Sequence, residues 1–199
     1  MKSIIILLLF ILPAYTFAQD DGATIRNYQK GKLQEDSSYV YWLPYKEGSK
    51  QLMVQGYLTH YSHATLIAND FKMKTGTTLC AARAGIVTNV KESSNIGGLK
   101  DKENNWNYIV ILHDDSTTAI YGHLKLNGAI VNEGDTVTKG QPIGISGNTG
   151  YSAFPHLHFQ VSNKEGEQIP VRFLTQFGKQ YLRQMGQYKC VHKESFKSK

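Results

Sequence analysis

Short apolar stretches alternate with turn-forming residues along most of this chain. The apolar stretches are rich in β-branched and aromatic residues, which is typical of strands. Clusters of glycine, asparagine and aspartate between them, such as SGNTG, mark turns. The strand-like stretches are YVYWLPY, QLMVQGYL, TTLCAA, GIVTNVK, NYIVILH, TAIYGHL and HLHFQV. Their short, fairly regular spacing predicts an all-β sandwich or barrel.

The two ends of this β-rich region have different patterns. Apolar residues in RFLTQFGKQYLRQMG, residues 172–186, recur at intervals compatible with a helix, so we expect a small C-terminal helical segment there. Residues 189–199 are rich in lysine and are expected to form a basic tail. Residues 19–38 are polar and are expected to be loosely ordered. The remaining segment, 39–188, is long enough for one domain.

The first 18 residues have the organisation of a secretory signal peptide. Lys2 gives a basic start, an apolar run extends from Ile4 to Leu12, and Thr16 and Ala18 occupy the positions that signal peptidase reads. The apolar run is shorter than the ~20 residues that a membrane-spanning helix needs. We therefore expect cleavage after Ala18, a periplasmic or secreted mature chain, and no stable membrane insertion afterwards.

Charge and cysteine content change this picture little. The net charge of +6 could favour an anionic surface such as a cell wall, and we expect no nucleic-acid partner. Export would place Cys80 and Cys190 in an oxidising compartment, which permits a disulfide between them. The alternative is that Cys80, in an apolar stretch, is simply a small buried residue.

Two histidines, His156 and His158, stand one residue apart in HLHFQV. On a strand, residues i and i+2 share a face, so both imidazoles would point one way and Leu157 and Phe159 the other. Such a pair suits two metal ligands, or one ligand and one acid–base group. Two polar residues on a solvated strand face are the alternative interpretation.

Other candidate ligands lie upstream of this pair. A catalytic zinc site typically has three protein ligands and one open position, and the candidates here are His63, Asp70 and His158. The chain has no H-E-x-x-H motif, so its ligands would come from separate strands rather than from one helix.

Taken in order, these segments resemble the lysostaphin/LytM-type zinc metallopeptidases. The matching motifs are Asp70 with Gly76-Thr77 six residues later, Y-x-H-L at 121–124, G-D-x-V-x-x-G-Q-x-I-G at 134–144, and H-L-H-F at 156–159. Each motif alone is weak, but their order and spacing together are specific. The resemblance implies a mostly antiparallel β-sandwich or open barrel with a groove over a zinc site.

The resemblance also implies one Zn²⁺ per chain, bound by Asp70, His158 and a histidine upstream of Asp70. The commonest pattern is H-x-x-x-D, but Leu66 stands four residues before Asp70 and cannot bind a metal. The chain resembles instead the subgroup with S-H, a loop and then A-x-D-F, which implies His63 as the third ligand, with His60 as the fallback.

The two remaining motif histidines, His123 and His156, are catalytic according to the same resemblance. Imidazole titrates near neutral pH, and the motifs leave open which of the two acts as the base. Two positions depart from the usual pattern: Phe154 stands where a glycine often precedes Pro-His, and Gln160 where glutamate is frequent.

The function that the resemblance implies is that of a monomeric, exported zinc endopeptidase that cuts peptidoglycan stem peptides or crosslinks. One alternative is a non-catalytic module of the same fold that binds the wall or activates another hydrolase. Another is a secreted peptidase acting on other peptides. Non-catalytic relatives typically lose ligands, whereas Asp70, His123, His156 and His158 are all present here, which favours the enzyme.

Overall fold

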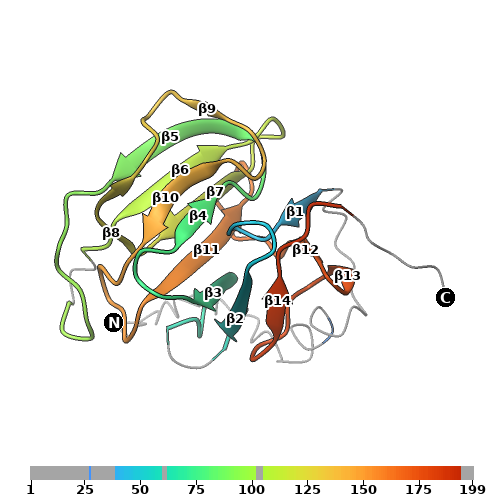
Figure 1. Cartoon of the computed structure of the whole chain (residues 1–199), viewed down its shortest axis with the longest axis horizontal. Helices are drawn as coiled ribbons and strands as arrows, with labels where there is room; N and C mark the ends of the chain where they lie inside the picture. The colour runs from blue at the N-terminus through green and yellow to red at the C-terminus, as the bar shows by residue number, and fades with distance from the viewer. Residues whose placement is uncertain (1–26, 28–38, 60–61, 102–104, 194–199) are drawn as a thin grey trace, which may run out of the picture.

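A computed structural model describes residues 27, 39–59, 62–101 and 105–193, and from Tyr39 onward every element in this part of the chain is a strand (Figure 1). The strands are β1 (Val40–Trp42), β2 (Lys50–Gln55), β3 (Ala68–Lys72), β4 (Thr78–Cys80), β5 (Gly85–Lys91), β6 (Tyr108–Leu112), β7 (Thr118–Gly122), β8 (Leu124–Ala129), β9 (Thr136–Val137), β10 (Pro142–Ser146), β11 (His156–Ser162), β12 (Arg172–Thr175), β13 (Gly178–Gln180) and β14 (Gln187–Lys189).

These strands form three sheets. The largest has eight strands in the order β14-β2-β3-β11-β7-β6-β5-β9, and two three-stranded sheets have the orders β4-β10-β8 and β1-β12-β13. Apart from the parallel pair β1–β12, the pairs between these described strands are antiparallel. The prediction of an all-β, mostly antiparallel fold is therefore confirmed.

The core lies between the eight-stranded sheet and the β4-β10-β8 sheet, which crosses in front of it in Figure 1. Leu79 and Ile143 from the smaller sheet belong to the same buried cluster as Ile109, Tyr121 and Phe159 from the larger one. The hydroxyl of Tyr121 accepts a hydrogen bond from the backbone N–H of Ala82. One face of the large sheet is thus fully packed, and its opposite face is left to carry polar residues.

The prediction of a small C-terminal helical segment at 172–186 is wrong. Instead, β12 and β13 form a hairpin, and β12 also pairs with β1. Gly178, at the turn, has φ +101°, a left-handed conformation that favours glycine and interrupts a helix. Phe173 is buried whereas Phe177 is exposed, so the apolar residues at helical spacing do not form one buried face. Pairing between strands here outweighs the weak helical preference of the local sequence.

The two cysteines, Cys80 and Cys190, are buried free thiols. Burial raises the pKa of both, that of Cys190 to about 12, so neither is a reactive thiolate at neutral pH. The predicted signal peptide, most of the segment 19–38, and the fallback ligand His60 lie outside the described residues. Among the described residues, no helix has the length and hydropathy that a bilayer crossing needs.

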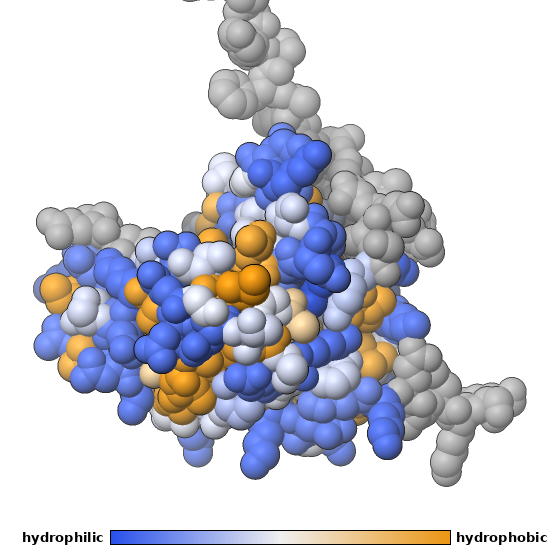
Figure 2. Space-filling model, turned by 90° about the horizontal axis from the view of Figure 1, so that it is seen from above, coloured by the Kyte–Doolittle hydropathy of each residue, from blue (hydrophilic) through white to orange (hydrophobic). Residues whose placement is uncertain are grey.

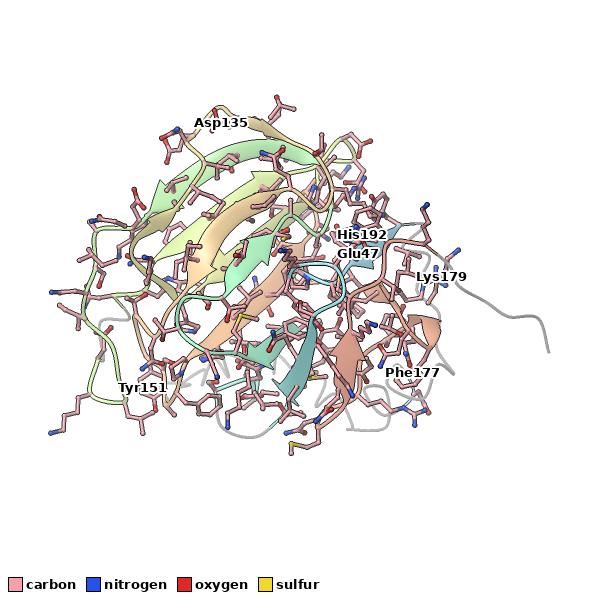
Figure 3. All side chains as sticks on the ribbon, viewed as in Figure 1. Glu47, Asp135, Tyr151, Phe177, Lys179 and His192 are labelled. Carbon is pink, nitrogen blue, oxygen red and sulfur yellow. The ribbon has the colours of Figure 1, made fainter. Side chains whose placement is uncertain are left out.

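The chain after β14 is held against the N-terminal strands. The imidazole of His192 stacks on the indole of Trp42 with 3.7 Å between ring centroids, and its Nδ1 lies 3.3 Å from Oε2 of Glu47. Figure 3 labels His192 and Glu47 side by side. Elsewhere the surface is mixed: on the face in Figure 2, apolar residues form separate patches among hydrophilic ones, as is ordinary for folded domains.

Candidate metal centre

The antiparallel pairing of β3 with β11 brings the acidic candidate to the histidine pair. His158 is the cross-strand partner of Asp70, and His156 is the partner of Lys72. Directly opposed residues on neighbouring strands share a face of the sheet. Leu157 and Phe159 point the other way and are fully buried in the core. The alternation expected from the H-x-H spacing is therefore present.

Three buried side chains converge at this point. Nε2 of His63 lies 3.2 Å from Oδ2 of Asp70, and Nδ1 of His158 lies 3.0 Å from Oδ1 of Asp70. One ligand atom from each residue lies within 4.8 Å of the other two. Nδ1 of His63 is 3.1 Å from the carbonyl oxygen of Gly56, so a proton on Nδ1 would leave the Nε2 lone pair facing Asp70.

This donor set fits a zinc ion. Two imidazole nitrogens and one carboxylate oxygen are ligands that Zn²⁺ takes in catalytic sites with an open fourth position. Burial raises the pKa of Asp70, but hydrogen bonds with His158 and His63 outweigh burial and hold this pKa well below its ordinary value. The carboxylate therefore stays ionised at neutral pH, as a metal ligand must.

The two candidate catalytic histidines lie beside this group. Their ring centroids are 4.3 Å apart, and Nε2 of His156 is 3.7 Å from Oδ2 of Asp70. Nδ1 of His123 lies 2.6 Å from the carbonyl oxygen of Thr149, and Nδ1 of His156 lies 2.8 Å from that of Phe154. Each imidazole is thus anchored by one nitrogen, which leaves Nε2 available for chemistry.

The protonation state of these two histidines follows from their surroundings. Burial, together with the neighbouring His156 and His158, lowers the pKa of His123 to about 3. Burial also lowers the pKa of His156, although Asp70 opposes this shift. Both imidazoles are therefore neutral at pH 7 and can accept a proton.

The backbone at His123 is unusual. His123 lies between β7 and β8 with φ 64°, a left-handed conformation that is uncommon for residues other than glycine. Its carbonyl oxygen accepts a hydrogen bond from the N–H of Gly147, at 2.9 Å. Such conformations are concentrated at functional sites, where surrounding contacts maintain them.

A pocket with a volume of about 330 Å³ surrounds these groups. Its lining residues are Ser62, His63, Leu66, Asp70, Trp106, His123, Tyr151, His156, His158 and Gln160. Trp106 forms an aromatic wall, with its ring centroid 5.4 Å from that of His123 and 5.6 Å from that of His158. Tyr151, labelled at the lower edge of the molecule in Figure 3, is 41% exposed and forms another part of the wall.

Neither these two aromatic residues nor the polar network behind them was predicted from the sequence. Asn107 is fully buried; its side-chain amide donates to the carbonyl oxygens of Ser94 and Lys125, and its Oδ1 accepts from the N–H of Ser94. The backbone N–H of Asn107 donates to Oγ1 of Thr149, whose carbonyl oxygen anchors His123. The motif Y-x-H-L identifies His123 but gives no signal for these supports.

Two further described histidines lie away from the pocket. Nδ1 of His113 is 2.9 Å from the carbonyl oxygen of Ala84, and its ring packs edge-on against Tyr41 in the core. His192 lies against Trp42. Of the histidines that the structure describes, His63, His123, His156 and His158 are therefore the ones that line the pocket.

The chain matches the model of a known peptidase family. The model of peptidase family M23 matches residues 67–170, which is more than half of the 199-residue chain. The chain therefore belongs to peptidase family M23, and the predicted relationship to the lysostaphin-type metallopeptidases is confirmed. The matched range contains Asp70, His123, His156 and His158, and His63 precedes it.

Individual relatives agree with this assignment. The chain is 35% identical over 92 residues to the peptidoglycan DD-endopeptidase ShyA of Vibrio cholerae. The aligned region covers 46% of this chain and 19% of ShyA. It is 36% identical over 114 residues to lysostaphin of Staphylococcus simulans, and this aligned region covers 55% of this chain and 21% of lysostaphin. The chain thus spans about a fifth of the length of each of these relatives.

A solved structure supports the same fold. The crystal structure of a zinc containing peptidase from Vibrio cholerae superposes with a TM-score of 0.50 at 25% identity. The superposition covers 65% of this chain and 38% of that one.

Proposed function

We propose that this chain is an exported, zinc-dependent endopeptidase that hydrolyses peptide bonds in peptidoglycan, in its stem peptides or crosslinks. The observation that carries the proposal is the complete group in one pocket. Ligand atoms of His63, Asp70 and His158 lie within 4.8 Å of one another, and the paired imidazoles of His123 and His156 lie beside them. Export is proposed from the signal-peptide pattern of the first 18 residues.

The chemistry follows from the donor set and the two neutral histidines. His63, Asp70 and His158 would hold one zinc ion, which when bound makes water acidic enough to ionise near neutral pH and polarises a peptide carbonyl. His123 and His156 can each accept a proton at Nε2 and return it to the leaving amine. An imidazole that carries a proton on Nε2 can also donate a hydrogen bond to the developing oxyanion.

The substrate class is proposed from one relative and from charge. ShyA is a peptidoglycan DD-endopeptidase, and the net charge of +6 suits an anionic wall. A non-catalytic wall-binding module and a peptidase for other secreted peptides are the competing functions. Non-catalytic use would not require both His123 and His156 to be kept beside an intact donor set.

The test combines metal content with hydrolysis. The purified chain should contain one zinc ion, release muropeptides from peptidoglycan, and lose this release in His156→Ala. His192→Ala is the matched control, because His192 lies outside the pocket, and this variant should retain activity. Zinc without hydrolysis of any wall type would favour another peptide substrate. Absence of both would favour the binding module.

A further inference from the structure

One lysine projects from the same face of the sheet as the candidate ligands. Lys72 follows Asp70 by two residues on β3, so both side chains lie on one face. Leu52 on β2 and His156 on β11 are the cross-strand neighbours of Lys72. Residues two apart on a strand are separated by about 7 Å. Lys72 is therefore placed beside His156, one step along the strands from the donor group.

The lysine contacts an aromatic side chain, that of Phe154. Nζ of Lys72 lies 5.6 Å from the ring centroid of Phe154, within the range of a cation–π contact. The ring of Phe154 is in turn 5.5 Å from the ring of His156. Phe154 is 39% exposed, so one part of its ring meets the lysine and another part faces solvent. Lys72, Phe154 and His156 form a continuous surface.

The charge of Lys72 is not neutralised within the described chain. Among the described residues, no carboxylate forms an ion pair with it. The carboxylate on the same face, Asp70, is engaged by His63 and His158. An exposed ammonium group next to a catalytic imidazole would attract an anionic group of a bound peptide.

We propose that Lys72 and Phe154 form a substrate subsite that binds a carboxylate-bearing residue close to the scissile bond. The ammonium group pairs with the carboxylate, and the exposed part of the Phe154 ring packs against the adjoining aliphatic carbons. This inference rests on the proposed endopeptidase function and narrows it. The preferred substrate is a wall peptide with a free carboxylate beside the cleaved bond, and an uncharged glycine bridge gains nothing from the subsite.

The test compares two forms of one substrate. Cross-linked muropeptides with free stem-peptide carboxylates are compared with the same muropeptides after conversion of these carboxylates to carboxamides. For the zinc-loaded wild type we expect a KM about fivefold lower for the acid form, the size of a partly exposed ion pair. High salt should reduce this ratio. The effect should appear in KM rather than kcat, because the carboxylate does not react.

Variants assign the preference to this subsite. Lys72→Gln should bring the KM ratio to about one, and Lys72→Arg should retain it. Lys74→Gln is the matched control, because it removes the same charge two residues further on, and it should retain the preference. Phe154→Leu should weaken the preference, because the ammonium group loses its aromatic partner.

The outcomes separate this inference from the proposed function. Equal KM values for both forms, or a preference that persists in Lys72→Gln, would overturn the subsite and leave the endopeptidase intact. Cleavage of neither form would instead contradict the proposed function. In that case, calorimetry compares the affinities of the two forms for the protein. Tighter binding of the acid form that depends on Lys72 would support the subsite, and equal affinities would overturn it.

Discussion

The indole of Trp106 occupies the space into which a side chain at Gly122 would project. A Cβ atom at position 122 would lie 2.3 Å from Cζ3 of Trp106, far inside van der Waals contact. Gly122 is the cross-strand partner of His158, so the tryptophan lies directly over the row of the sheet that carries this candidate ligand. The absent side chain at Gly122 thus creates room for the aromatic wall of the pocket.

Gly122→Ala is expected to displace Trp106 and destabilise the protein by about 1–3 kcal/mol, as overpacking generally does. Urea unfolding measures the stability, and tryptophan fluorescence reports the displacement. In the double variant with Trp106→Leu, the penalty of the added methyl group should largely disappear. A penalty that is equal in the presence and absence of Trp106 would show that the indole is not the obstacle.

Zinc content should separate the roles of the pocket residues. Asp70→Ala removes a proposed ligand, and the variant should contain little zinc and show little activity. His123→Ala should retain one zinc ion but lose activity by about 10²- to 10⁴-fold, the usual contribution of an acid–base group. Atomic emission on purified variants gives the metal content. Loss of zinc in His123→Ala would place that histidine among the ligands instead.

Asn107 is expected to act on His123 through Thr149. Asn107→Ala removes hydrogen bonds to part-buried backbone groups of Ser94 and Lys125, which should cost about 1–2 kcal/mol of unfolding free energy. The variant keeps the backbone N–H that donates to Thr149, but the loss of the side-chain bonds should let this N–H shift, and Thr149 and its carbonyl with it. In the folded fraction kcat should therefore fall more than KM changes. Asn163→Ala, in an exposed turn, is the control. An unchanged kcat would limit Asn107 to a structural role.

The acid stability of the protein should depend on Asp115. Burial raises the pKa of this carboxyl, but hydrogen bonds from Thr117 and Arg83 outweigh it and lower the pKa to about 2. A lowered pKa in the folded state contributes stability above the unfolded pKa of about 4, which is lost as the pH falls towards 2.

Asp115→Asn should therefore be less stable than the wild type at pH 6, and the two should converge at pH 2. The side chain of Asp115 is 44% exposed, so the difference at pH 6 should be about 1 kcal/mol or less. Urea unfolding at both pH values checks this. A difference that is the same at both pH values would contradict the linkage.

The sequence predicted the strands and the meeting of His156 and His158 because alternation on a strand is a local property. It offered Asp70 as a candidate ligand, but only the family resemblance assigned this residue to one site with His158, since the pairing of β3 with β11 joins residues far apart in the chain. The helix expected at 172–186 failed for the same reason: the parallel partner β1 is distant in sequence, and its pairing decides the conformation.

Trp106 and Asn107 show a second limit of sequence reasoning. Trp106 follows a turn-rich segment and Asn107 begins the strand-like stretch NYIVILH, and neither position is marked as part of a pocket. Trp106 reaches the pocket because Gly122 leaves room, and Asn107 is buried because the segments that carry Ser94, Lys125 and Thr149 meet around it. Neither property is encoded in the spacing of nearby residues, so only the assembled fold reveals them.

Strand β11 joins the pocket to the core, since His158 lies on one face and Leu157 and Phe159 on the other, between β3 and β7. Amides in such a central strand exchange with solvent only when the whole sheet opens. The backbone of Asp70 and His158 is therefore fixed by the sheet before any ion binds, unlike that of small zinc domains, which fold only with their metal. Removal of zinc should thus abolish activity without unfolding the protein, and addition of zinc should restore activity.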